Sequence, residues 1–153
     1  MRAVSFFIAD TSALIAAYDN AAAQQEKVQT LLASSVAVVS PLVLDEVDHL
    51  LVARFGKDRR VADLVLDDLL TSAEEGAILV PPVDHHDLRV AQRLIHQFGG
   101  LRLDLADAVN VVLAERYLTN AIVTLDERDF RALTPLTPSF AAFHLPIQDG
   151  ESE

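Results

Sequence analysis

The most constraining feature of this sequence is a set of short apolar runs separated by longer segments of helical periodicity. The runs are rich in Val and Ile and show no alternation of polar and apolar residues, which is typical of strands buried on both faces of a sheet. Because longer segments separate them, they predict an α/β sandwich with a mostly parallel sheet of four to five strands. The runs are Val4–Ala9, Val36–Val39, Ile78–Val80, Ala121–Leu125 and a weaker fifth, Ala142–Leu145.

Helical periodicity marks the segments between these runs. The helix predicted over Pro41–Arg54 has a clear start, with Ser40 as the N-cap and Pro41 at the first helical position. A chain of 153 residues without an internal linker predicts a single domain over residues 1–147. The acidic tail, 148–153, is expected to fray. The predicted helices are Ser12–Tyr18, Gln24–Ala33, Pro41–Arg54, Arg59–Glu75, Asp84–Phe98 and Asp104–Tyr117.

Composition excludes several kinds of chemistry. The sequence contains no cysteine, which excludes disulfides, cysteine-ligated metal sites and thiol catalysis. Its formal net charge of −11 opposes loose, nonspecific binding to nucleic acid, but it permits a nuclease that holds metal ions in an acidic cluster. Asp10 interrupts the apolar N-terminal run, and no window reaches the roughly 18 apolar residues of a membrane span. We therefore expect a cytoplasmic protein with no membrane partner.

Two acidic residues follow predicted strands. Asp10 comes at the end of the first run and Asp126 at the end of the fourth. In an open parallel sheet, ligands bind beyond the carboxyl ends of the strands. Each residue also has a purely structural explanation, because Asp favours turns and helix N-caps. Neither position is therefore diagnostic when it is considered alone.

Other carboxylates lie on predicted helices. Glu46 flanks a stripe that is expected to be buried, so its carboxylate is partly desolvated and needs a partner. Asp104 and Asp107 open the last long helix, where an N-cap and the helix dipole also account for acidic residues. The rest of that helix is apolar almost all round, which predicts that its acidic end lies against other structure. The expected stripe beside Glu46 is Val43, Val47, Leu50 and Leu51.

If these carboxylates converge, their charges need compensation. Several uncompensated negative charges in one place would drive protonation or unfolding. A divalent cation removes this problem, and oxygen-only ligands favour a hard ion such as Mg²⁺ or Mn²⁺. Such a site suits hydrolysis of phosphodiester bonds.

Four motifs together resemble PIN domains, and specifically the VapC-type toxin ribonucleases. Their order and spacing agree with that family from residue 4 to about residue 145, and together they are far more specific than any single motif. The motifs are IADTSALI (8–15), SPLVLDEV (40–47), LADA (105–108) and TLDERDF (124–130).

This resemblance implies a three-layer α/β/α sandwich whose parallel sheet brings Asp10, Glu46, Asp107 and Asp126 together. It implies a Mg²⁺- or Mn²⁺-dependent endoribonuclease in which Asp10 and Asp107 are the main metal ligands. Glu46 and Asp126 would complete the cluster or position water, and these four residues would be the catalytic set. The hydroxyls of Thr11 or Ser12 would support the site, and Asp104 would have a less constant supporting role.

The same resemblance also implies partners. It implies a homodimer and a VapB-type antitoxin that blocks the acidic groove. Structured RNA, either tRNA or ribosomal RNA, would be the substrate.

Basic residues are candidates for contacts with RNA phosphates. The densest basic run spans residues 54–60, although a solvated turn between two helices is the more ordinary explanation for it. Four further arginines lie close in sequence to the acidic motifs and could line a groove: Arg102, Arg116, Arg128 and Arg131. In the run itself, the candidate contacts are Arg54, Lys57, Arg59 and Arg60.

Two other functions remain open at this point. A receiver-like signalling domain would also place acids and Mg²⁺ at strand ends, but it needs a lysine after its last strand. The only lysines are Lys27 and Lys57, and neither follows a predicted strand. The second alternative is a non-catalytic acidic α/β binding module in which the carboxylates only cap helices.

Overall fold

The computed structural model describes residues 4–150 and contains a four-stranded parallel sheet with the strand order β3-β2-β1-β4. Strand β1 pairs with β2 on one side, where Phe7 lies opposite Ala37, and with β4 on the other, where Ile8 lies opposite Ile122. The chain therefore changes direction across the sheet beside β1, which is where α/β folds bind ligands. The strands are β1 (Phe6–Ala9), β2 (Val36–Val38), β3 (Ile78–Leu79) and β4 (Ile122–Val123).

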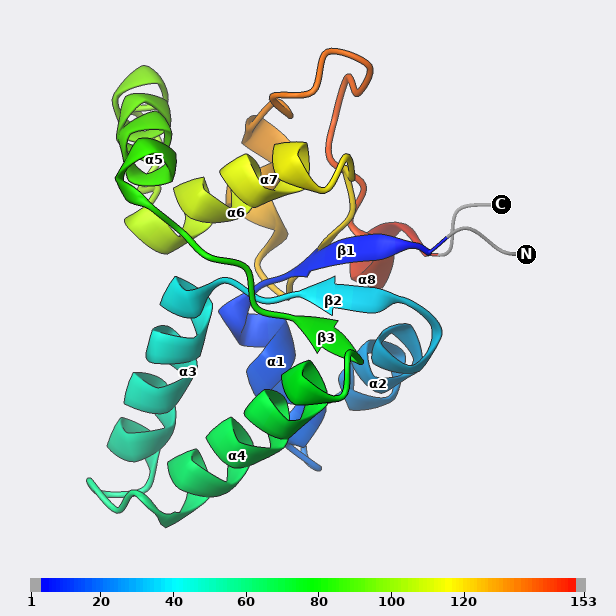
Figure 1. Ribbon diagram of the computed structural model, residues 1–153, viewed down its shortest axis with the longest axis vertical. Helices are drawn as coiled ribbons and strands as arrows, with labels where there is room; N and C mark the ends of the chain where they lie inside the picture. Colours follow the sequence, from blue (N-terminus) through cyan, green and yellow to red (C-terminus); the bar gives the residue numbers. More distant parts are fainter. Residues whose placement is uncertain (1–3, 151–153) are drawn as a thin grey trace.

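Helices cover both faces of this sheet and form the three layers (Figure 1). Helices α1 to α4 pack on one face, and α5 to α7 pack on the other. None of the helices within residues 4–150 has both the length and the apolar character needed to cross a bilayer. The helices are α1 (Thr11–Tyr18), α2 (Gln25–Ser34), α3 (Pro41–Arg54), α4 (Arg60–Glu74), α5 (His85–Gln97), α6 (Leu105–Arg116), α7 (Glu127–Ala132) and α8 (Pro146–Asp149).

The direction of the β1 side chains explains why the site faces α6. Successive side chains of a strand point to opposite faces. Phe7 and Ala9 belong to the core under α1 to α4, whereas Ile8 belongs to the core under α5 to α7. Asp10 continues the direction of Ile8, so its carboxylate projects toward the face that α6 covers.

The predicted parallel sheet is confirmed, with four strands rather than five. The fifth apolar run contributes only an isolated parallel bridge between Ala121 and His144. Leu50, which we expected in the buried stripe of α3, is 49% exposed. The buried residues of α3 are Val43, Val47 and Leu51.

The C-terminal end also differs from the sequence-based expectation. The expected frayed tail begins inside α8, where the backbone NH of Asp149 donates to the carbonyl oxygen of Leu145. Arg131 of α7 holds the Asp149 carboxylate in an ion pair. Residues 151–153 of that tail lie outside the described part of the chain.

Candidate active site

Asp10 is a nearly buried carboxylate at the end of β1. It occupies the N-cap position of α1, but its side chain makes no capping hydrogen bond. Instead, the hydroxyl of Thr124 donates to Asp10 Oδ2 at 2.8 Å, and that of Ser12 donates at 3.4 Å. Burial raises the pKa of the Asp10 carboxyl, and the hydrogen bond from Thr124 partly offsets that shift. Helix capping therefore does not explain this residue.

The hydroxyls beside Asp10 are held by the end of β4. The backbone NH of Leu125 donates to Ser12 Oγ at 2.9 Å, and the NH of Asp126 donates to Thr124 Oγ1 at 3.0 Å. The Thr124 hydroxyl has more than one acceptor within reach, and Asp10 Oδ2 at 2.8 Å is closer than the carbonyl oxygen of Asp126 at 3.3 Å. The carboxyl ends of β1 and β4 are thus joined through side chains as well as through the sheet.

Glu46 reaches the site from α3, which begins at the Ser40–Pro41 start predicted from the sequence. The hydroxyl of Thr11 donates to Glu46 Oε1 at 3.3 Å. The Glu46 side chain is partly exposed. Its pKa is raised first by desolvation and then by the charges of Asp104 and Asp10. Glu46 therefore lies within electrostatic range of the carboxylate at the end of β1.

Asp104 and Asp107 enter at the first turn of α6. Asp104 is the N-cap, and its Oδ1 accepts from the backbone NH of Asp107 at 2.9 Å. Burial raises the pKa of Asp107 to about 8, with further contributions from the negative charges of Asp104 and Asp10. Asp104 therefore lies within electrostatic range of Asp10, Glu46 and Asp107, which makes it the common neighbour of the group. We call Asp10, Glu46, Asp104 and Asp107 the coupled acids.

Asp126 occupies a different environment. Its side chain is exposed and makes no capping bond to α7. Its charge is not among those that raise the pKa of Asp10, Glu46 or Asp107. It lines a separate hollow of about 590 Å³ with Arg102, Arg128 and Asp129. The structure therefore brings three of the four predicted catalytic acids into one electrostatic group and leaves Asp126 at its margin.

The donor set suits a hard divalent cation. The coupled acids supply carboxylate oxygens only. The pKa values of Asp10, Glu46 and Asp107 are raised by burial first and by neighbouring negative charge second, and a cation would offset both effects. Within residues 4–150, no three acidic or histidine side chains are already gathered closely enough to surround an ion. Binding of one shared ion would therefore require these side chains to move closer together.

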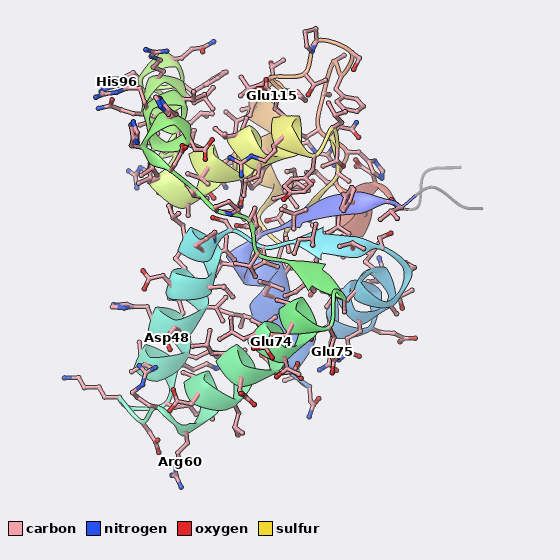
Figure 2. The ribbon with its side chains drawn as sticks, in the orientation of Figure 1. Asp48, Arg60, Glu74, Glu75, His96 and Glu115 are labelled. Atoms are coloured by element: carbon pink, nitrogen blue, oxygen red, sulfur yellow. The ribbon has the colours of Figure 1, made fainter. Side chains whose placement is uncertain are left out.

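The basic run at residues 54–60 lies at the outer end of the α3–α4 hairpin, where Arg60 points away from the body of the protein (Figure 2). Its three arginines all form ion pairs with nearby carboxylates. Lys57 stands in the turn itself with a φ of 69°. The pairs are Arg54 with Asp19 at 3.1 Å, Arg59 with Asp48 at 2.7 Å and Asp63 at 3.1 Å, and Arg60 with Asp58 at 2.8 Å.

Two residues near the site were not singled out in the sequence. Thr124 is the first residue of the TLDERDF motif. Its position two residues before Asp126 was the only sequence signal that could have linked it to the site. Asn110 lies one helical turn beyond Asp107 on α6 and is fully buried. Neither polar atom of its side chain has a hydrogen-bond partner among the described residues. A lone polar residue in the apolar sequence of α6 was the signal that could have identified it.

Comparisons with known proteins agree on one family. Residues 7–134 match the family model of the PIN domain. The chain is 40% identical over 131 residues to Ribonuclease VapC26 of Mycobacterium tuberculosis, covering 84% of this chain and 93% of that protein. Among solved structures it resembles VapC20 of Mycobacterium tuberculosis, described as a toxin that cleaves the sarcin–ricin loop. That match has a TM-score of 0.68 and 20% identity, and it covers 81% of this chain and 92% of the other.

Proposed function

This chain belongs to the PIN domain family, and from that premise we propose that it is a metal-dependent endoribonuclease, the toxin of a VapBC-type toxin–antitoxin pair. The family match covers most of a single α/β/α unit, which supports one domain over residues 1–147. The high identity to a protein named as a ribonuclease supports the reaction type. Neither a receiver-like domain nor a passive binding module accounts for this match.

The observation that carries the proposal is the electrostatic coupling of the acids at the carboxyl end of β1. Asp10 is 8% exposed, and the pKa of Asp107 is raised to about 8. A protein that used these groups only as helix caps would gain nothing from burying them against one another. A site that binds a divalent cation does gain, because the cation favours the ionised form of the carboxyl groups and offsets the repulsion between them.

Asp10, Glu46 and Asp107 would hold Mg²⁺ or Mn²⁺ through their carboxylate oxygens. The chemistry supplied by such an ion is activation of water and neutralisation of charge on the phosphate. Thr124 and Ser12 orient Asp10 through their hydroxyls, and Thr11 orients Glu46. Asp104 fixes the first turn of α6 and so places the backbone of Asp107.

Asp126 has a separate role in this scheme. Its exposed carboxylate lies at the margin of the coupled acids, beside the hollow lined by Arg102 and Arg128. From there it would accept a hydrogen bond from water or substrate near the reacting phosphate. Its contribution to metal affinity should be smaller than that of Asp107.

The proposed partners follow from the family. The substrate would be a structured RNA, either tRNA or ribosomal RNA, which places the activity in the cytoplasm. A VapB-type antitoxin would inhibit the enzyme by covering the acidic site, and the active form would be a homodimer. Mixing the purified chain with an antitoxin candidate and following the mass of the complex tests this assembly.

The direct test is cleavage of RNA by the purified chain. Total RNA should be cut in Mg²⁺ or Mn²⁺ and remain intact in EDTA. Asp10→Asn should abolish cutting without unfolding the protein. Glu115→Gln removes the same charge at the opposite end of α6, on an exposed side chain, and should leave cutting unchanged (Figure 2). Full activity of Asp10→Asn, or no stabilisation of the wild type by Mn²⁺, would contradict the proposal and favour a binding module.

A further inference from the structure

The hollow beside Asp126 combines two arginines with the margin of the acidic site. It has a volume of about 590 Å³ and is lined by residues from the loop before α6 and from the start of α7. Arg102 and Arg128 are both exposed. Within residues 4–150, neither guanidinium lies within ion-pair distance of a carboxylate, although Asp126 and Asp129 line the same hollow. Their charge is therefore available to a ligand.

This availability distinguishes Arg102 and Arg128 from the other basic residues that the sequence analysis named as candidate RNA contacts or groove-lining arginines and that form ion pairs. The arginines of the 54–60 run are all paired with carboxylates. Of the other two arginines near the acidic motifs, Arg116 pairs with Asp87 at 2.6 Å, and Arg131 pairs with Asp149. An arginine that already has a carboxylate partner must give up that partner to bind a phosphate. Arg102 and Arg128 have no such cost.

The positions of the two arginines tie the hollow to the acidic site. Arg102 stands two residues before Asp104, and Arg128 stands two residues after Asp126. Two residues of extended chain span about 7 Å, so each guanidinium can reach only a phosphate close to the site. A second hollow of about 400 Å³ is lined by Glu46, Asp104 and Leu105. Arg102 lines the first hollow and Asp104 lines the second, so both hollows border the segment that leads into α6.

We infer that Arg102 and Arg128 form a phosphate-binding subsite that holds the RNA backbone next to the scissile bond, an inference that rests on the proposed nuclease function. Planar guanidinium groups bind phosphate oxygens through paired hydrogen bonds. A chain of net charge −11 repels RNA over most of its surface, so productive binding requires local cations at the site. These two arginines are positioning residues, because they hold the substrate without contacting the reacting atoms.

The test counts phosphate contacts by salt dependence. The affinity of a short fluorescein-labelled RNA of mixed sequence is measured against salt concentration, with EDTA present to prevent cleavage. Each phosphate contact on a single strand contributes roughly 0.7 to the slope of log affinity against log salt. Arg102→Gln/Arg128→Gln should therefore lower the slope by about 1.4 and weaken binding about 25-fold near 0.1 M salt.

Two double variants serve as matched controls for lost charge. Arg89→Gln/Arg93→Gln removes two positive charges from exposed positions of α5 and should leave the slope unchanged. Arg54→Gln/Arg60→Gln removes two charges from the basic run and examines the competing site directly. A fall in slope for that variant, with none for Arg102→Gln/Arg128→Gln, would overturn the inference.

Kinetics separate substrate positioning from the metal site. Arg102→Gln/Arg128→Gln should raise KM for RNA cleavage with little change in kcat, and Mn²⁺ should stabilise this variant as much as the wild type. A parallel loss of Mn²⁺ stabilisation would mean that the arginines act through the carboxylates, which contradicts the subsite. If the wild type itself neither binds nor cuts RNA, the proposed function fails as well. If the wild type binds and cuts RNA but Arg102→Gln/Arg128→Gln shows the same salt slope and KM as the control variants, the subsite is rejected and the proposed function stands.

Discussion

The acidic residues at the carboxyl end of the sheet fall into two groups with different surroundings. Of the coupled acids, Asp10, Glu46 and Asp107 are partly or largely buried, and burial first and then the charge of the exposed Asp104 raise their pKa values. Asp126, at the end of β4, is exposed and shares its hollow with Arg102 and Arg128. A cluster of negative side chains that is shielded from water attracts a small cation strongly. A site that contains both negative and positive side chains suits a polyanion that must be held and released.

One hydroxyl joins the two groups. Thr124 Oγ1 donates to the Asp10 carboxylate at 2.8 Å and accepts from the backbone NH of Asp126 at 3.0 Å. Any shift of the loop after β4 therefore moves a donor on the buried carboxylate. The proposed metal site and the proposed RNA subsite are therefore chemically different but joined through Thr124.

The largest effect is expected for Asp107→Asn. Cleavage should fall by more than about 100-fold, because even the loss of an outer partner of a metal ligand costs 10- to 100-fold. The metal-free protein should become more stable, by about 2 °C or more in Tm, since the variant removes a carboxyl group whose ionisation is disfavoured by burial beside Asp104 and Asp10. Calorimetry in EDTA and RNA cleavage in Mn²⁺ measure the two effects. Lower stability together with lower activity would indicate a purely structural role.

The second prediction concerns pH. The pKa of Asp107 is raised to about 8 in the folded state from 3.8, so the folded protein binds this proton more tightly than the unfolded chain. The contribution of this group to stability therefore falls as pH rises from about 4 to 8. Denaturation at pH 5 and pH 8 in EDTA should show a decrease that is smaller in Asp107→Asn, and saturating Mn²⁺ should reduce it in the wild type. Identical pH dependence in both proteins would contradict this cause.

Thr124→Val tests the link between the two groups and should have an intermediate effect. The variant keeps the shape of this buried residue but removes the donor to Asp10. We expect cleavage to fall about tenfold and Mn²⁺ affinity to fall with it, as for other partners that orient metal ligands. Thr124→Ser restores the hydroxyl and should recover most of the activity. If Thr124→Val and Thr124→Ser are equally impaired, packing rather than the hydrogen bond is responsible.

The sequence predicted those parts of the fold that depend on local signals. The Ser40–Pro41 start of α3 and the Asp104 N-cap of α6 are present as expected, because the residues that form a cap are adjacent in the chain. The unalternated apolar runs also identified all four strands. The fifth run failed as a strand because only His144 pairs with a neighbour, through a single bridge to Ala121.

Properties that depend on distant partners could not be predicted in this way. The basic run at 54–60 gave no indication that Asp19, Asp48 and Asp58 would pair with its arginines. Likewise, nothing local distinguishes Asp126 from Asp10, since each follows an apolar run. Their different burial arises because α6 covers the end of β1, whereas the end of β4 opens toward the loop that carries Arg102.

Asp126→Asn gives the smallest expected effect and is the sharpest test of the division into two groups. Because its side chain is exposed, the stability of the metal-free protein should change by less than about 0.5 kcal/mol. Mn²⁺ affinity should stay near that of the wild type, and cleavage should fall less than about tenfold, since this carboxylate would contact water or substrate rather than hold the ion alone. Titration of Mn²⁺ beside Asp107→Asn provides the measurement. Equal loss of Mn²⁺ affinity in the two variants would mean that Asp126 and the coupled acids both ligate the ion. The difference in burial between them would then not correspond to a difference in chemical role.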